Sequence, residues 1–429
     1  MKECIIDLPL EHGRFHGLHT ATPSVFALTG SFRTAPVLER GELMLQQLVA
    51  MLVTCGTRRR DQFEMADLLE SRGASLSVES GLCRVSFSAR ACSDDMPMVV
   101  DLLSECLREP RLDAADFVTE RTRLIAELQY HGAEPAALAS DALSRMLYCP
   151  GHPRHQADFA EQVSLIERLT VDDVRRYHRE HFGANDLRVV AVGDIDPHAV
   201  AAEVDRRLAS WLPRLARQVE DPVDPTPEGP QVARMQALGR ANFDVALGQR
   251  LSIRCDHPDY MALWIANHIL GGTFTSRLVS AVREEQGLTY SIRSELARPE
   301  REFDGHWQVT LSLSAEKLDA GLVSTRAEIA RFVGDGVTAQ ELAAKRLEAI
   351  GAFHIGLATL HGLSETILFG AENGWGPDYI REFAGMVGAV TYDQLNAVIA
   401  EHLHPAELQT TIAGPFADEQ LRLTDGVAA

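Results

Sequence analysis

An arginine and a tyrosine in the second half of the chain have residue types and a spacing that would let them act on one substrate atom. Arg283 ends an amphipathic stretch that predicts a helix, Gly287 permits a turn, and Tyr290 begins a predicted strand. Both side chains could then donate hydrogen bonds to one carbonyl oxygen. Donors aimed at the charge that develops on such an oxygen contribute several kcal/mol in other enzymes. The alternative is purely structural, with Arg283 paired to a neighbouring glutamate and Tyr290 packed on a sheet.

No familiar catalytic motif accompanies this pair. The sequence contains no G-x-x-x-x-G-K-[ST], no G-x-G-x-x-G after a strand, no G-x-S-x-G, and neither H-E-x-x-H nor H-x-x-E-H. His12, His16 and His19 are closely spaced, but Gly13 and Gly17 argue against a helix that would bring them together. We therefore predict a solvated loop in this region rather than a metal site.

The composition excludes several classes of function. The 429 residues carry 41 Lys and Arg against 61 Asp and Glu, a net charge of −20. This balance argues against nucleic-acid binding, because that affinity comes mostly from neutralising phosphates. No stretch approaches the ~20 apolar residues that cross a membrane. Seven scattered cysteines without a C-x-x-C pair indicate a reducing compartment. We therefore expect a cytoplasmic protein, or a periplasmic one if a leader was removed.

An internal repeat organises the chain into two halves. Residues 170–193 and 391–414 align without a gap at an offset of 221. Each copy predicts a threonine N-cap, an amphipathic helix, a short loop and a strand that ends at glycine. The repeat also matches Glu180-His181 with Glu401-His402. A histidine near a helix end is more typical of capping than of metal binding.

A proline-rich linker separates the halves. Four prolines fall within residues 220–230, where neither a helix nor a central strand can continue. We assign 1–215 to the first half, 216–232 to the linker and 233–429 to the second half. In each half strands and helices cluster rather than alternate strictly. This order predicts a duplicated α+β fold, in which each half is an antiparallel sheet with helices packed on one face.

This layout resembles the pitrilysin and mitochondrial-processing-peptidase family of zinc metallopeptidases, the inverzincins, in which two homologous α+β halves form a clamshell. Active halves of that family carry H-x-x-E-H on the first long helix, shortly before Gly-Thr, and a third ligand, Glu, on a later helix. Counting back from Gly56-Thr57, the two ligand histidines fall at Gln47 and Met51 and the general base at Ala50. A catalytic zinc needs three protein ligands and an open position. The resemblance therefore implies a degenerate site without metal.

Other parts of the family pattern are retained. The later helix keeps two spaced glutamates, Glu120 and Glu127, with Glu127 at the third-ligand position, and we interpret both as vestigial. Residues 271–291 follow the C-terminal pattern, in which an arginine and a tyrosine placed as Arg283 and Tyr290 bind substrate near the zinc. The family also offers a sheet edge to extended peptides. The corresponding candidate peptide contacts here are Ala74, Ser75, Leu76 and Ser77.

A lost zinc motif beside a retained Arg/Tyr pair resembles the non-catalytic subunit of bacterial heterodimers in this family. The resemblance implies that this chain binds no cofactor, that zinc lies in a homologous partner subunit, and that Arg283 and Tyr290 assist peptide cleavage at the partner's site. Two alternatives are an inert structural or peptide-binding scaffold, and a hydrolase whose metal site uses other histidines. The Arg/Tyr pair discriminates against the scaffold, which has no chemical reason to keep it.

Overall fold

The computed structural model describes residues 4–34, 41–214, 229–297 and 301–417, and the chain divides into two compact units. The first unit contains residues 1–127, 161–220 and 353–381, and the second contains residues 128–160, 221–352 and 382–429. Each unit thus includes one segment that chain order assigns to the other half. Most of the predicted linker, residues 216–228, lies outside the described residues. Among the described helices, none combines the length and the apolar character that crossing a bilayer requires.

The first unit is built on a six-stranded sheet with the order β1-β2-β6-β3-β5-β4. Its strands are β1 (Ile6–Leu10), β2 (Gly13–His19), β3 (Val25–Arg33), β4 (Ser75–Ser80), β5 (Arg84–Cys92) and β6 (Leu187–Gly193). Neighbouring strands are antiparallel except β2 and β6, which are parallel. The sheet therefore differs from a purely antiparallel one at this pair, because β2 and β6 are joined by a long crossover rather than a hairpin.

Strand β2 corrects the prediction of a solvated loop around His12, His16 and His19. His16 is buried in β2. Gly13 and Gly17, which argue against a helix, instead allow neighbouring segments to approach the backbone of β2 closely. A Cβ at Gly13 would lie 2.4 Å from the carbonyl oxygen of Leu187 in β6, so only glycine fits there.

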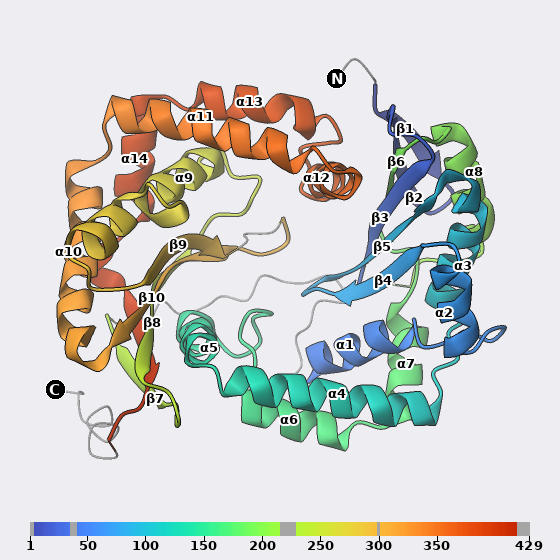
Figure 1. Ribbon diagram of the computed structural model, residues 1–429, viewed down its shortest axis with the longest axis horizontal. Coiled ribbons are helices and arrows are strands. Elements are labelled where there is room, and N and C mark those ends of the chain that lie inside the picture. Colours follow the sequence, from blue (N-terminus) through green and yellow to red (C-terminus); the bar gives the residue numbers. More distant parts are fainter. Residues whose placement is uncertain (1–3, 35–40, 215–228, 298–300, 418–429) are drawn as a thin grey trace. The chain divides into compact units, whose positions relative to one another are not determined.

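Helices cover both faces of this sheet. Gly17 faces α8 (Pro197–Leu208), since a Cβ there would lie 2.5 Å from Pro197. The next residue, Leu18, points to the opposite face, where it packs with Val190, Val192 and residues of α12 (Leu360–Glu372). α8 and α12 accordingly lie on opposite sides of the strands in Figure 1. We expected helices on one face of the sheet. The second face is covered by α12, which comes from the segment 353–381. The other helices of this part of the chain are α1 (Glu42–Leu52), α2 (Gln62–Glu70), α3 (Met96–Arg108), α4 (Ala114–Gly132), α6 (Phe159–Arg168) and α7 (Val171–His181).

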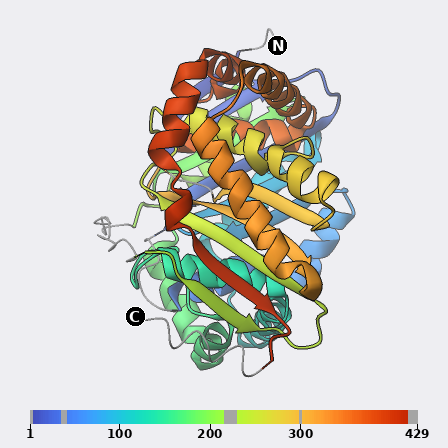
Figure 2. The ribbon, with the colours of Figure 1, turned by 90° about the vertical axis from the view of Figure 1, so that its left-hand side faces the viewer.

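The second unit contains a five-stranded sheet with the order β7-β11-β8-β10-β9, and only its β7–β11 pair is parallel. On one face α5 (Pro135–Leu147) packs Leu143 against Ala246 and Ala413. Figure 2 shows α10 crossing the strands in front of the sheet. The strands are β7 (Val232–Gln236), β8 (Asn242–Leu251), β9 (Ser291–Ala297), β10 (Gly305–Ser314) and β11 (Gln409–Gly414). The remaining helices are α9 (Tyr260–Asn267), α10 (Leu318–Asp335), α11 (Ala339–Gly356), α13 (Tyr379–Ala389) and α14 (Tyr392–His402).

The internal repeat and the α+β class are confirmed. Helix α7 and strand β6 of the first unit correspond to α14 and β11 of the second, with the same helix bounds at the offset of 221. Thr170 accepts a hydrogen bond from the Asp173 N–H, and Thr391 accepts one from the Gln394 N–H. Both threonines are therefore N-caps, as the sequence predicted.

Candidate functional site

Arg283 lies between two aromatic rings in the second unit. It belongs to a π-helix, η3 (Val279–Glu285), and its guanidinium carbon is 5.1 Å from the ring centre of Phe274 and 5.1 Å from that of Tyr290. Both distances are those of cation–π contacts. The structure thus brings the predicted pair together and adds Phe274, which sequence reasoning missed. We refer to Phe274, Arg283 and Tyr290 as the arginine stack.

The arginine stack faces solvent. Tyr290 is 84% exposed and Phe274 is 63% exposed, so the tyrosine does not pack on the sheet as the structural alternative required. The structural alternative also expected Arg283 to pair with a neighbouring glutamate, and Arg283 Nε does lie 3.3 Å from Glu284 Oε1. Within the described ranges, no protein group forms a hydrogen bond with the Tyr290 hydroxyl. A half-buried guanidinium beside an exposed phenol is suited to donate hydrogen bonds to another molecule.

The turn between Arg283 and Tyr290 is closed by specific contacts. Gly287 has a φ of 58°, and its N–H donates to the Arg283 carbonyl oxygen at 3.0 Å, which ends the helix. Lys317 Nζ donates to the Gly287 carbonyl oxygen at 2.6 Å. The Thr289 hydroxyl lies 2.6 Å from the Ser312 carbonyl oxygen, which anchors the residue before Tyr290 to β10. The predicted helix, turn and strand are present, although the helix is wound as a π-helix.

A buried lysine positions the third member of the stack. Lys345 of α11 donates from Nζ to the hydroxyls of Thr273 and Thr275, the two residues that flank Phe274. The same ammonium contacts Glu348 Oε2 at 2.7 Å, so its charge is paired although the residue is only 6% exposed. Lys345 thus holds the segment that places the Phe274 ring against Arg283.

A second ion pair connects α11 to the segment that precedes η3. Arg277 donates to both oxygens of Glu341, at 2.6 and 2.8 Å, and the Thr338 N–H donates to Glu341 Oε2 at 2.7 Å. These donors, led by the hydrogen bonds from Arg277, lower the pKa of Glu341 from 4.5 to about 2. The carboxylate therefore stabilises the fold in its ionised form.

Replacing Glu341 by glutamine is expected to lower stability in a pH-dependent way. Because the folded-state pKa lies below the unfolded one, the stabilisation is fully present above about pH 4.5 and is lost as the pH falls towards about 2. The difference in free energy of unfolding between wild type and Glu341→Gln should therefore narrow as the pH falls from 5 to 3. Urea titrations across this range measure it, and a difference that stays constant with pH would contradict the assignment.

The three positions of α1 that would carry the catalytic zinc site have no suitable ligands. On α1, Ala50 is buried and apolar, Met51 offers a thioether, and Gln47 offers an amide. Zinc in proteins is held by thiolate, imidazole or carboxylate. The buried glutamine of this helix, Gln46, has a structural part instead, since it accepts a hydrogen bond from Tyr177 and donates to the Gly81 carbonyl oxygen. The donor set therefore does not fit the family's zinc.

The two retained glutamates are also engaged. Arg123 contacts Glu120 at 2.6 Å and Glu127 at 3.3 Å along α4, so both carboxylates are neutralised by the same guanidinium. Burial and the Glu120 charge raise the pKa of nearby Cys55 to about 12. That thiol stays protonated at neutral pH. The interpretation of Glu120 and Glu127 as structural residues agrees with these contacts.

The candidate peptide contacts lie at a sheet edge. β4 is the last strand of the six-stranded sheet and pairs with β5. Ser75, Leu76 and Ser77 lie in β4, and Ser77 forms a hydrogen bond with Ser88 of β5 at 2.9 Å. Ala74 precedes the strand, and its N–H already donates to the Leu69 carbonyl oxygen. Ala74 therefore has no main-chain donor to offer, whereas the strand itself has the form of an edge that accepts an added strand.

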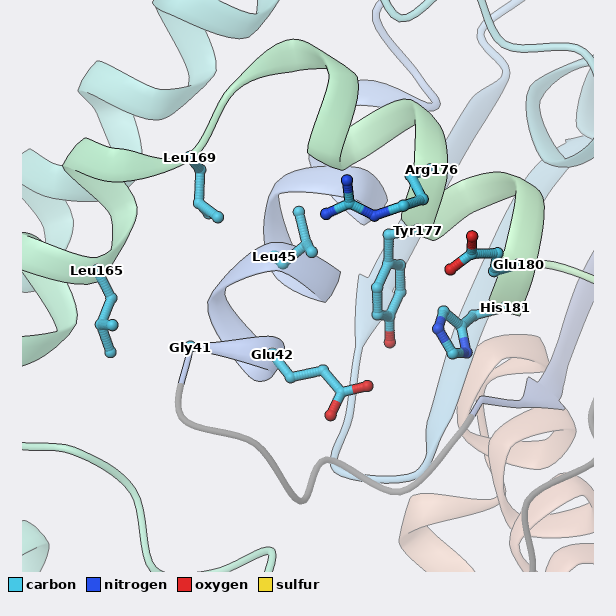
Figure 3. Close-up of a pocket in the computed structure, with 9 residues that line it drawn as sticks. All are labelled: Gly41, Glu42, Leu45, Leu165, Leu169, Arg176, Tyr177, Glu180 and His181. Carbon is cyan, nitrogen blue, oxygen red and sulfur yellow. The ribbon is translucent and has the colours of Figure 1, made fainter.

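A pocket of about 260 Å³ lies in the first unit, where α1 begins and α7 ends (Figure 3). Glu42, Glu180 and Arg176 supply charges of both signs, and His181 is the repeat counterpart of His402. Tyr177 donates to Gln46 at 2.7 Å, and burial raises its pKa so that it stays neutral. The other lining residues are Gly41, Leu45, Leu165 and Leu169.

Comparisons with known proteins agree with this arrangement. A family model described as Insulinase (Peptidase family M16) matches residues 46–152, and one described as Peptidase M16 inactive domain matches residues 168–348. The second match includes all three members of the arginine stack. The two models together cover the chain from residue 46 to residue 348 except for residues 153–167.

Individual relatives are distant but extensive. The chain is 24% identical to an uncharacterized zinc protease of Streptomyces coelicolor over 96% of this chain and 88% of the relative. It is 24% identical to the non-peptidase homolog YmxG of Helicobacter pylori over 71% of this chain and 69% of that protein. Its fold is similar to a crystal structure of a peptidase M16 inactive domain from Pseudomonas fluorescens, with a TM-score of 0.85, 22% identity, and coverage of 96% of this chain and 98% of that one.

Proposed function

The chain belongs to the M16 peptidase family as a non-catalytic homologue, and from this premise we propose that it is the substrate-binding subunit of a heterodimeric zinc metalloendopeptidase. The observation that carries the proposal is the exposed arginine stack, in which Phe274 and Tyr290 hold the Arg283 guanidinium between them. A homologous partner that bears H-x-x-E-H supplies the metal, since the positions on α1 do not fit one.

Arg283 and Tyr290 act on the peptide carbonyl that is cleaved. The guanidinium and the phenol hydroxyl each donate a hydrogen bond to its oxygen, which becomes negatively charged as the carbonyl is attacked. Because the stack is assembled before substrate arrives, its donors need little reorganisation during the reaction. Phe274 and Tyr290 restrict the arginine side chain, which would otherwise lose rotamer freedom on binding.

The edge of β4 provides a place for the rest of the peptide. Ser75, Leu76 and Ser77 would pair with an extended segment through main-chain hydrogen bonds, which bind a backbone with little regard to its sequence. This mode of binding suits a subunit that holds peptides for a partner. The same edge would serve the second candidate function, a peptide-binding scaffold without catalysis, which the likeness to a protein named as a non-peptidase homolog favours.

Lys345→Met is expected to lower partner-dependent kcat/KM about tenfold, because the threonines that flank Phe274 lose their common donor and the stack loosens. Glu348→Gln is the companion variant, since it keeps the lysine and both threonines and removes only the carboxylate charge that pairs with the ammonium. A double-mutant cycle with Arg283→Ala separates positioning from general destabilisation. Lys345→Met should add little to Arg283→Ala, and fully additive losses would contradict the positioning role.

The proposal is tested with the complex isolated from the cells that make this chain. Its peptidase activity should be sensitive to chelators and should require both chains. The scaffold would instead leave activity unchanged when Arg283 and Tyr290 are substituted.

A further inference from the structure

Three potential metal ligands meet in the second unit, where α9 begins and α14 ends. His402 Nε2 lies 3.1 Å from Asp259 Oδ2, and His257 Nδ1 lies 3.8 Å from the same oxygen. One ligand atom from each residue lies within 4.8 Å of the other two. In the part of the chain that the structure describes, no other group of three His, Cys, Asp or Glu side chains meets this condition.

The donor set and its spacing suit a transition-metal ion. Metal–ligand distances of about 2.0–2.2 Å place tetrahedral ligands roughly 3.3–3.5 Å from each other, and the observed 3.1 and 3.8 Å are close to this separation. Two imidazoles and a carboxylate are ligands for borderline divalent ions such as zinc, cobalt and nickel. Three protein ligands leave a further position for water.

The site is held in place by its surroundings. The Gln249 side-chain amide donates to the His402 carbonyl oxygen at 2.8 Å and accepts from the His404 N–H at 2.7 Å, which fixes the end of α14. That helix end carries partial negative charge and favours a cation. Asp259 is the N-cap residue of α9, yet its side chain makes no capping hydrogen bond and instead contacts His402. Its carboxylate is thus directed at the imidazole at the end of α14 and not at its own helix.

In the described part of the first unit, the repeat histidine does not form the same cluster. The corresponding junction of α1 and α7 contains His181, the repeat counterpart of His402, beside the pocket in Figure 3. Within the described residues, His181 belongs to no group of three such ligands. The repeat histidine is common to both units, whereas the aspartate and second histidine beside it are found in the second.

We propose that His257, Asp259 and His402 bind one borderline divalent transition-metal ion, for which Zn²⁺ and Co²⁺ are the probes. The ion ties the start of α9 to the end of α14. This site belongs to the second unit, whereas Gln47, Ala50 and Met51 belong to the first. It departs from the expectation that the chain binds no cofactor, and it is independent of the proposed partner.

The metal must displace two existing contacts. The Asp259 N–H donates to His257 Nδ1 at 3.2 Å, and His402 Nε2 forms a hydrogen bond with Asp259 Oδ2 at 3.1 Å. His402→Asn removes the imidazole and keeps a donor for Asp259, and His257→Ala removes the most exposed of the three ligands. His404→Ala is the matched control, because it removes an exposed histidine from the same segment.

The full chain, stripped with a chelator, is titrated with Zn²⁺ by calorimetry and with Co²⁺ by absorption spectroscopy. We expect one ion per chain, a rise in melting temperature with Zn²⁺, and affinity at least tenfold weaker in His402→Asn and in His257→Ala. His404→Ala should bind as wild type does. The absence of binding, equal affinity in all variants, or thiolate-to-cobalt charge-transfer bands, which would place the ion on a cysteine, would each overturn the proposal.

Discussion

Replacing Arg283 by alanine is expected to lower peptide hydrolysis by the complex about 10²–10³-fold, which corresponds to about 2.7–4 kcal/mol of transition-state stabilisation. The loss should fall mainly on kcat, because the hydrogen bond strengthens as the carbonyl oxygen becomes negative. Tyr290→Phe retains the ring that stacks on Arg283 and removes only the hydroxyl, so it tests the second donor separately. Steady-state kinetics on a fluorogenic peptide measure both variants.

Assembly should survive these substitutions, because Tyr290 is exposed, Arg283 is only half-buried, and few contacts of the fold depend on them. Arg293→Ala is the matched control, since Arg293 is an exposed arginine of β9 with an acidic partner, Glu295, at 2.6 Å. Size-exclusion chromatography of the complex checks that the partner is retained. Turnover that is unchanged in both Arg283→Ala and Tyr290→Phe would remove the catalytic part of the proposal and leave the scaffold.

Ile367→Ala is expected to destabilise the protein by about 2–5 kcal/mol. Ile367 of α12 is fully buried against Val190 and Val192 of β6, so removing its side chain leaves a cavity beneath the helix. The loss would show that a segment late in the sequence completes the core of the first unit. Val323→Ala, at a position 69% exposed on α10, should change stability by less than ~0.5 kcal/mol. Urea unfolding measures both, and equal effects would contradict this packing.

Helix starts and turns could be predicted from short stretches of the sequence. Thr170 and Thr391 predict the starts of helices, because a hydroxyl at the N-cap accepts a hydrogen bond from a backbone N–H that has no partner within the helix. The structure confirms both residues as N-caps. The turn at Gly287 follows from the same kind of reasoning, since glycine accepts the positive φ that ends a helix. Arg283 and Tyr290 lie close together because the turn that joins them is short.

Long-range packing could not be predicted in the same way. Nothing in the local pattern says that α12 covers the sheet of the first unit and α5 that of the second, because an amphipathic face specifies burial but no particular sheet. The contact between Phe274 and Arg283 could not be predicted, because the spacing of the two residues in the sequence is not distinctive. Likewise, His257 and His402 are far apart in sequence, and only the meeting of α9 and α14 places them together.

Affinity isolation of the tagged chain from its own cells tests the central claim most directly. Wild-type and Arg283→Ala chains are captured in parallel, the co-purifying proteins are identified by mass spectrometry, and peptidase activity is assayed with and without chelator. We predict that both capture a homologous chain carrying H-x-x-E-H in equal amounts, and that only the wild-type complex has full chelator-sensitive activity. A chain that elutes alone, or an Arg283→Ala complex as active as wild type, would contradict the account.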